Sequence, residues 1–194
     1  MMNLRWAIFA SGRGSNFRNF LELEGQLKHQ TIVCFHSDKS CPAGLLAKDH
    51  AKPALILSPT QPDHEKQLLN FLQEHQVNAI FLMGYMRLLK PSFLSQWQGA
   101  LVNLHPSRLP EFKGKNAIQK AYEAKAEILG VSLHRVVEEV DSGEILRQRV
   151  FCRDFGLDLA ALEARFHQEE HELVREFVFD LDRDESFRLA LRGS

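Results

Sequence analysis

The chain has 194 residues, of which 44% are hydrophobic and 25% are charged, a balance typical of a globular protein that can bury a core without staples. Its 24 basic and 25 acidic residues give a formal net charge of −1, which disfavours a dedicated nucleic-acid binder. Three cysteines without a CxxC pair, and the lack of a signal-peptide pattern or a long apolar run, predict a reduced, cytoplasmic protein without a membrane span.

Strand-like and helix-like segments alternate over the first 104 residues. Short apolar runs predict strands at residues 6–10, 31–35, 54–57, 79–83 and 101–104. The spacing of apolar residues between them predicts helices at residues 16–29, 42–51, 62–75 and 91–97. Because these strands are apolar on both faces and separated by helices, we expect an α/β fold with a doubly wound, mostly parallel sheet and helices on both faces.

The pattern changes in the last third of the chain. A helix is predicted at residues 116–125, followed by strand-like runs at 128–140 and 145–151 and a long helix at 159–179. The two runs meet at an Asp-Ser-Gly turn, which predicts an antiparallel C-terminal extension of the sheet. Since no repeat or linker interrupts the chain, we expect a single domain over residues 1–194.

The strand predicted at residues 101–104 delivers Asn103 and His105 two residues apart, just before Pro106. Alternate side chains of a strand share a face, so the amide and the imidazole should point the same way. Such a pair suits the stabilisation of negative charge on a carbonyl oxygen and the movement of a proton. Asp141, in the acidic turn, would orient His105 and favour its protonated form if the two met. Taken alone, that turn is an ordinary exposed one.

Two glycines follow the first predicted strand, in the segment Ser11-Gly12-Arg13-Gly14-Ser15-Asn16. Ser15 or Asn16 could cap the next helix, and free N–H groups at a helix start favour an anion. Phe17 stands where a dinucleotide fingerprint has its third glycine, and no Walker lysine follows. The loop therefore either binds a single phosphate of a small metabolite or is a plain turn that needs glycine.

The segment from His167 to His171 matches the H-x-x-E-H spacing of some zinc peptidases. It lies on a Glu-rich amphipathic helix without a third ligand downstream, so a solvated helix face, or one residue turned toward a substrate, is favoured over zinc. We expect no metal. His134 is predicted to be a packed core residue and the remaining histidines to lie on the surface. Lys113 is expected to be solvated.

Five segments, at residues 11–16, 84–87, 103–107, 130–134 and 141–143, together resemble the glycinamide ribonucleotide formyltransferase family of folate-dependent formyltransferases. The resemblance implies that Asn103, His105 and Asp141 are catalytic. It implies that substrate phosphate binds at Gly14, Ser15 and Asn16. It also implies a ribonucleotide contact at Glu170 and a set of folate-binding residues, which comprises Arg87, Leu88, Leu89, His64, Val136, Val137, Glu138, Glu139 and Val140.

The implied substrates are 10-formyltetrahydrofolate, as co-substrate, and the primary amine of glycinamide ribonucleotide in de novo purine (IMP) biosynthesis. No metal, nucleic acid or membrane is implied, and the protein would be a monomer or a homodimer. Phosphate binding would fall in about residues 1–100, and catalysis and folate binding in about residues 101–194. The chain departs from the family at Lys115, where several members carry a histidine, and at Arg135, where an aromatic or aliphatic residue is usual.

Four alternatives remain beside this family. A sugar-nucleotide N-formyltransferase would share the catalytic residues but not the glycine loop. A formyltetrahydrofolate hydrolase would normally add an N-terminal domain, and a methionyl-tRNA formyltransferase would need a basic C-terminal domain. A non-catalytic protein that binds a phosphorylated metabolite is the alternative outside the enzymes, because fold does not settle function.

Overall fold

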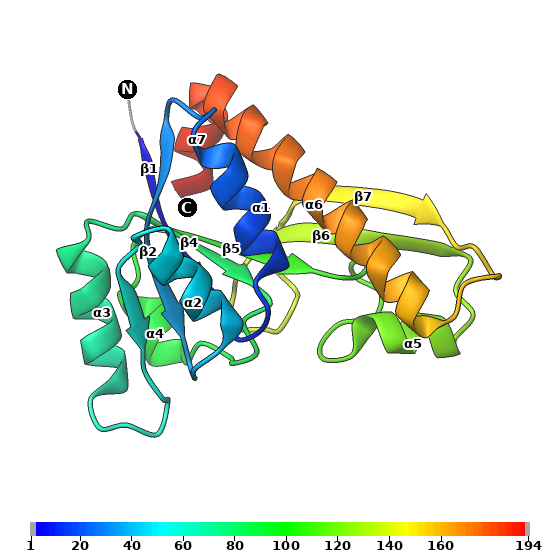
Figure 1. Cartoon of the computed structure of the whole chain (residues 1–194), viewed down its shortest axis with the longest axis horizontal. Coiled ribbons are helices and arrows are strands. Elements are labelled where there is room, and N and C mark those ends of the chain that lie inside the picture. The colour runs from blue at the N-terminus through cyan, green and yellow to red at the C-terminus, as the bar shows by residue number, and fades with distance from the viewer. Residues whose placement is uncertain (1–2, 193–194) are drawn as a thin grey trace.

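Seven strands form one mixed sheet within residues 3–192, the part of the chain that the computed structural model describes (Figure 1). Their order across the sheet is β3-β2-β1-β4-β5-β6-β7. The bounds are β1 Leu4–Phe9, β2 Gln30–Ser37, β3 Ala54–Ile56, β4 Ala79–Met83, β5 Ala100–His105, β6 Ile128–Arg135 and β7 Ile145–Cys152. Neighbouring strands from β3 to β5 run parallel, whereas β6 pairs antiparallel with both β5 and β7. The predicted fold class is therefore confirmed.

Helices cover both faces of this sheet (Figure 1). Helices α1, α2, α5, α6 and α7 contribute to one apolar cluster, and α3 and α4 to a second one on the opposite face. The bounds are α1 Ser15–Glu24, α2 Pro42–Asp49, α3 His64–Glu74, α4 Pro91–Gln96, α5 Ala117–Glu123, α6 Leu159–Arg183 and α7 Glu185–Arg192. No helix in the described residues is long and apolar enough to cross a membrane.

The pleat of β1 shows why the central strands are apolar on both faces. Trp6 and Ile8 belong to the cluster under α1 and α6, whereas Ala7 and Phe9 belong to the cluster under α3 and α4. Successive side chains of a strand point to opposite faces, so a strand covered on both sides needs apolar residues at every position. The same alternation runs through β4, all of whose residues are buried.

Four local predictions differ from the structure. The helix predicted at residues 16–29 ends at Glu24. The strand predicted to reach residue 140 ends at Arg135, and the chain leaves the sheet as a loop from 136 to 144. The helix predicted to stop at residue 179 runs to Arg183, and α7, which the sequence analysis did not predict, follows it. Gly14, in a left-handed conformation, occupies the position before α1, so the predicted capping by Ser15 or Asn16 is wrong.

The loops after β1 and β4 meet at the point where strand order reverses. Neighbouring strands β1 and β4 are followed by helices on opposite faces of the sheet, the arrangement that gives open α/β sheets a crevice at the carboxyl ends of their strands. Ser11 holds the two loops together, because its N–H donates to Gly84 O at 3.1 Å and its Oγ accepts from Met86 N at 3.1 Å. In open α/β sheets this crevice is where ligands bind.

Candidate active site

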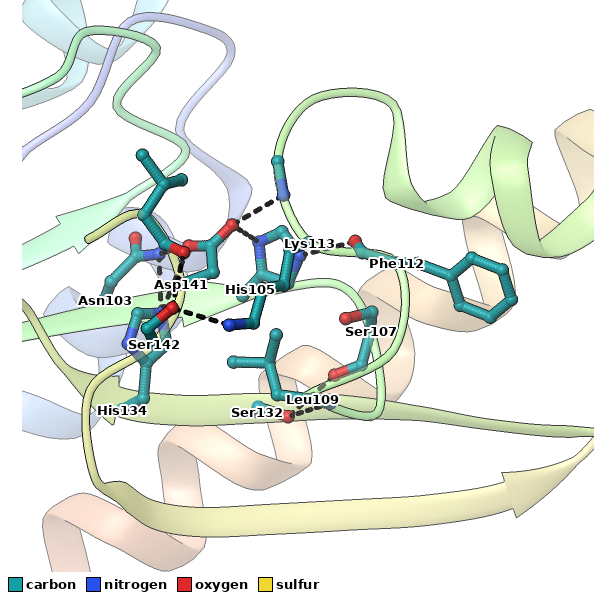
Figure 2. Close-up of polar contacts among 12 residues, drawn as sticks. Asn103, His105, Ser107, Leu109, Phe112, Lys113, Ser132, His134, Asp141 and Ser142 are labelled. Carbon is teal, nitrogen blue, oxygen red and sulfur yellow. Dashed lines mark hydrogen bonds and ion pairs between the residues drawn. The ribbon is translucent and has the colours of Figure 1, made fainter.

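Asn103 and His105 stand at the carboxyl end of β5 and point to the same face, as the sequence predicted (Figure 2). They lie on the same face of the strand as Leu101, which packs against α3 and α4 nearer the start of β5. In the antiparallel pairing with β6, Asn103 lies opposite His134 and His105 opposite Ser132. The polar end of β5 is thus extended sideways by polar side chains of β6.

Asp141 completes this cluster from the turn after β6. Its Oδ2 lies 3.4 Å from His105 Nδ1, and its Oδ1 lies 3.4 Å from Asn103 Nδ2. Gly114 N–H donates to Oδ2 at 2.8 Å, so the loop after β5 also holds the carboxylate. The residue has a φ of 50°, in the left-handed region that Asp tolerates better than most residues. The proximity of Asp141 to His105, which the sequence could only suggest, is confirmed.

Both ring nitrogens of His105 face oxygen acceptors. Nε2 lies 3.1 Å from Phe112 O, and because a carbonyl oxygen only accepts, Nε2 carries the proton of the neutral ring. Nδ1 faces Asp141. Burial lowers the pKa of His105 below its ordinary value, against the raising effects of Phe112 O and Asp141. The carboxylate of Asp141 thus favours a proton on this ring, while burial disfavours one.

Asp141 is held as a carboxylate despite its surroundings. Burial alone would raise its pKa, but the imidazole of His134, the Gly114 N–H and nearby His105 lower the pKa to about 2. Asp141 is thus ionised throughout the neutral range. It can stabilise a proton that arrives on His105.

His134 is buried, as predicted for a core histidine, but it also takes part in the cluster. Its Nδ1–H donates to Arg135 O at 2.8 Å, and its Nε2 lies 3.0 Å from Asn103 Nδ2 and 3.4 Å from Asp141 Oδ1. Asn103 Nδ2 thus lies close to both His134 and Asp141. Sequence reasoning missed this contact because only the β5–β6 register places the two residues side by side.

The loop after β5 and the turn that carries Asp141 are tied together over the cluster (Figure 2). Lys113 Nζ donates to Ser142 Oγ at 2.5 Å and lies 3.7 Å from Glu139. The predicted solvated lysine is therefore a cross-link between two site loops.

The glycine loop and Glu170 meet although 154 residues separate them in sequence. Asn16 Nδ2 donates to Glu170 Oε2 at 2.9 Å, and His167 Nδ1 lies 3.0 Å from the same oxygen. Asn16 Oδ1 is buried without a partner among residues 3–192, so an acceptor is left for a ligand. Gly14 has a φ of 80°, and a Cβ there would lie 2.7 Å from Ala43 Cβ. Among the described residues no side chain caps the first turn of α1, whose N–H groups have no partner within the helix.

Known proteins resemble this chain in sequence and in fold. A family model described as "Formyl transferase" matches residues 4–178. A phosphoribosylglycinamide formyltransferase of Bacillus subtilis is 32% identical over 86% of this chain and 89% of its own length. The chain belongs to the phosphoribosylglycinamide formyltransferase family.

Solved structures of two other family members superpose on this one. The enzyme of Bacillus halodurans is 34% identical, with a TM-score of 0.86 over 91% of this chain and 94% of its own. Glycinamide ribonucleotide transformylase 1 of Geobacillus kaustophilus is 35% identical, with a TM-score of 0.83 over 100% of both chains. This chain is therefore a formyltransferase of that family by sequence and by fold.

The two segments that the family resemblance assigns to folate both present exposed apolar residues, and the first is also held by a buried carboxylate. Arg87 Nε donates to the buried carboxylate of Asp38 at 2.9 Å, and Ser11 Oγ donates to the same carboxylate at 2.6 Å. Asp38 follows the carboxyl end of β2, a position that could have marked it as a site residue. Leu88 of this segment and Val137 of the 136–140 segment are exposed. Apolar surface is therefore available on both.

His64 lies apart from Asn103, His105 and Asp141, at the start of α3. It lines a hollow of about 960 Å³ between α3 and α4, which also includes Lys90 and Trp97. Its ring centroid is 6.2 Å from that of His36, whose Nε2 lies 3.2 Å from Tyr85 Oη. His36 is fully buried, so the expectation that the remaining histidines lie on the surface is wrong for this residue.

Within residues 3–192, no three His, Cys, Asp or Glu side chains gather as metal ligands would. His167 is engaged by Glu170, and their hydrogen bond raises the pKa of His167. His171 Nε2 is buried without a partner among the described residues. The H-x-x-E-H spacing therefore serves the contact with the glycine loop.

Proposed function

We propose that this protein transfers the formyl group of 10-formyltetrahydrofolate to the primary amine of glycinamide ribonucleotide, in de novo purine biosynthesis. The observation that carries the proposal is the convergence of Asn103, His105 and Asp141, with 3.4 Å between Asp141 and each of the other two, in a member of this family. We also propose that it acts in the cytoplasm as a monomer or homodimer, on small molecules alone.

The reaction begins when the amine nitrogen attacks the formyl carbon and the carbonyl π electrons move to oxygen. Asn103 Nδ2 exchanges its longer contact, the 3.4 Å one with Asp141, for the formyl oxygen and donates to it. Protonated His105 donates to the same oxygen, and Asp141 stabilises this imidazolium. Asp141 also assists the removal of one proton from the attacking nitrogen.

Collapse of the tetrahedral intermediate completes the transfer. The carbonyl forms again, the bond between the formyl carbon and folate N10 breaks, and N10 receives the proton that the attacking nitrogen gave up. The products are formylglycinamide ribonucleotide and tetrahydrofolate, so atoms and charges balance.

Binding is assigned to groups around this centre. The substrate phosphate lies on Gly14, Ser15 and Asn16, where the first turn of α1 is uncapped, and Glu170 receives the ribose hydroxyls. Folate is bound by residues 87–89 and 136–140, with His64 at the edge of the site. The domain is used in two halves, with phosphate bound mainly by residues 1–100, and with the chemistry and the larger share of the folate residues in residues 101–194. Binding energy from the phosphate holds the amine in place for attack.

The uncapped glycine loop joined to Glu170 favours a phosphorylated amine over water as the acceptor. A hydrolase would use water, and a sugar-nucleotide enzyme would not need this loop. The deciding assay follows the absorbance change of 10-formyltetrahydrofolate with glycinamide ribonucleotide, with a nucleotide amino-sugar, and with buffer alone. Turnover that requires glycinamide ribonucleotide supports the proposal. Equal turnover in buffer supports a hydrolase, and binding without turnover a non-catalytic protein.

Substitutions test the three roles. Asn103→Ala should lower kcat by about 10²–10³-fold, the usual cost of losing one donor to an oxyanion. His105→Ala and Asp141→Asn should lower it at least as far. His50→Ala and Asp49→Asn, both exposed on α2 or at its end, are matched controls expected to keep full activity. Near wild-type turnover in all three site variants would refute the assignment.

A further inference from the structure

Arg135 connects the end of β6 to the C-terminal helix. Its Nη1 donates to Leu191 O at 2.5 Å and its Nη2 to Ala190 O at 2.6 Å, both in the last turn of α7. Its Nε donates to Glu144 at 2.7 Å. Carbonyls in the last turn of a helix have no partner within the helix, so the planar guanidinium satisfies groups that would otherwise need water.

The backbone of Arg135 closes the loop that carries Asp141. Its N–H donates to Glu144 O at 2.9 Å, and its carbonyl oxygen accepts from His134 Nδ1 at 2.8 Å. Gly143 lies so close to the same carbonyl that a Cβ added to it would be only 1.9 Å from the oxygen. Both ends of the loop from 136 to 144 are thus joined at one residue, whose side chain is fixed to α7.

Helix α7 has an anchor of its own. Leu191 is 1% exposed in the apolar cluster under α6, and the Phe187 ring meets the Phe177 ring of α6 at 5.8 Å. Arg188, also buried, donates to Leu181 O at the end of α6. The carbonyls that receive Arg135 are therefore part of a packed element, and the loop is attached to a fixed support.

We propose that Arg135 is a positioning residue for the formyl donor, which holds the loop from 136 to 144 against α7. The inference rests on the proposed function, because that loop carries five of the residues assigned to folate as well as Asp141. The expected signature is a defect in donor binding that spares binding of the amine substrate.

Arg135→Gln removes the bonds to α7 and to Glu144 and keeps a polar side chain. We expect KM for 10-formyltetrahydrofolate to rise about tenfold and KM for glycinamide ribonucleotide to stay within about twofold. Hydrogen exchange measured by mass spectrometry should become faster at the amides of residues 136–144. Arg135→Lys, which keeps the charge but has one ammonium group, should lie between this variant and the unchanged protein.

Arg5→Gln is the matched control. This arginine, on β1, also donates to two backbone carbonyls beyond a helix end, Gln76 O at 3.2 Å and His75 O at 3.1 Å, both just after α3. The proposal is overturned if Arg135→Gln leaves donor KM and exchange unchanged, or if Arg5→Gln has the same effects. If Arg135→Gln does not fold, Arg135→Lys decides by the same two measurements. If the unchanged protein shows no transfer, the proposed function fails, and the exchange experiment alone still decides the positioning role.

Discussion

One methyl group can test the turn that carries Asp141. A Cβ on Gly143 would lie 1.9 Å from Arg135 O and 2.8 Å from the carbonyl carbon, whereas ordinary van der Waals contact starts at 3.4 Å. Gly143→Ala must therefore move the turn and the end of β6 apart by about 1.5 Å. Because Asp141 lies only two residues earlier, its 3.4 Å contact with His105 should open by a comparable amount.

A displacement of about 1 Å at reacting groups costs about 10²-fold in rate, or about 2.7 kcal/mol of activation free energy. We therefore expect kcat of Gly143→Ala to fall about 100-fold in the formyl-transfer assay. Gly25→Ala is the control, because its Cβ would meet nothing within 4 Å and its φ of −65° suits alanine. Wild-type kcat and thermal stability in Gly143→Ala would refute the reasoning, since the turn would then tolerate the displacement.

Three other substitutions separate substrate binding, acid stability and packing. Glu170→Gln weakens an acceptor shared by two partners, so KM for glycinamide ribonucleotide should rise about tenfold in steady-state assays, with kcat within about twofold. Burial lowers the pKa of His36 to about 4, so the unfolded chain takes up that proton first as pH falls. Urea titrations should show a loss of up to about 3 kcal/mol of unfolding free energy between pH 6.5 and 4, and His36→Phe should reduce that slope. Glu169→Gln, which removes a buried carboxylate between two arginines, should cost about 1–2 kcal/mol of unfolding free energy, against less than about 0.5 kcal/mol for exposed Glu176→Gln.

The parallel part of the sheet could be predicted because each strand carries its own signal. In β1 and β4 every described position between Trp6 and Phe9 and between Ala79 and Met83 is buried, so the apolar run itself marks the strand. The placement of Asn103 and His105 on one face followed from the two-residue period of a strand. These features are local, and local sequence determines them.

The features that the sequence did not reveal depend on distant partners. The apolar residues at 136, 137 and 140 continue a strand-like pattern, but the pairing of Arg135 with Glu144 turns the chain out of the sheet. The proximity of Asp141 to His105 depends on that turn and on the β5–β6 pairing. Helix α7 did leave a signal in the sequence, because an aspartate stands just before it, at the N-cap position. In the structure Asp184 Oδ1 accepts from Ser186 N and Phe187 N, as an N-cap does.

The strand order has a consequence for how the protein is made. Trp6 pairs with both Ile32 and Ala79, so the middle of the sheet can close only after β4 has been synthesised. The glycine loop can make its final contacts only later, because Glu170, the partner of Asn16, lies 154 residues further along the chain. Contacts at such sequence separation slow folding. A nascent chain is therefore expected to complete its catalytic strands before its substrate loop, so that activity arises only when α6 has docked.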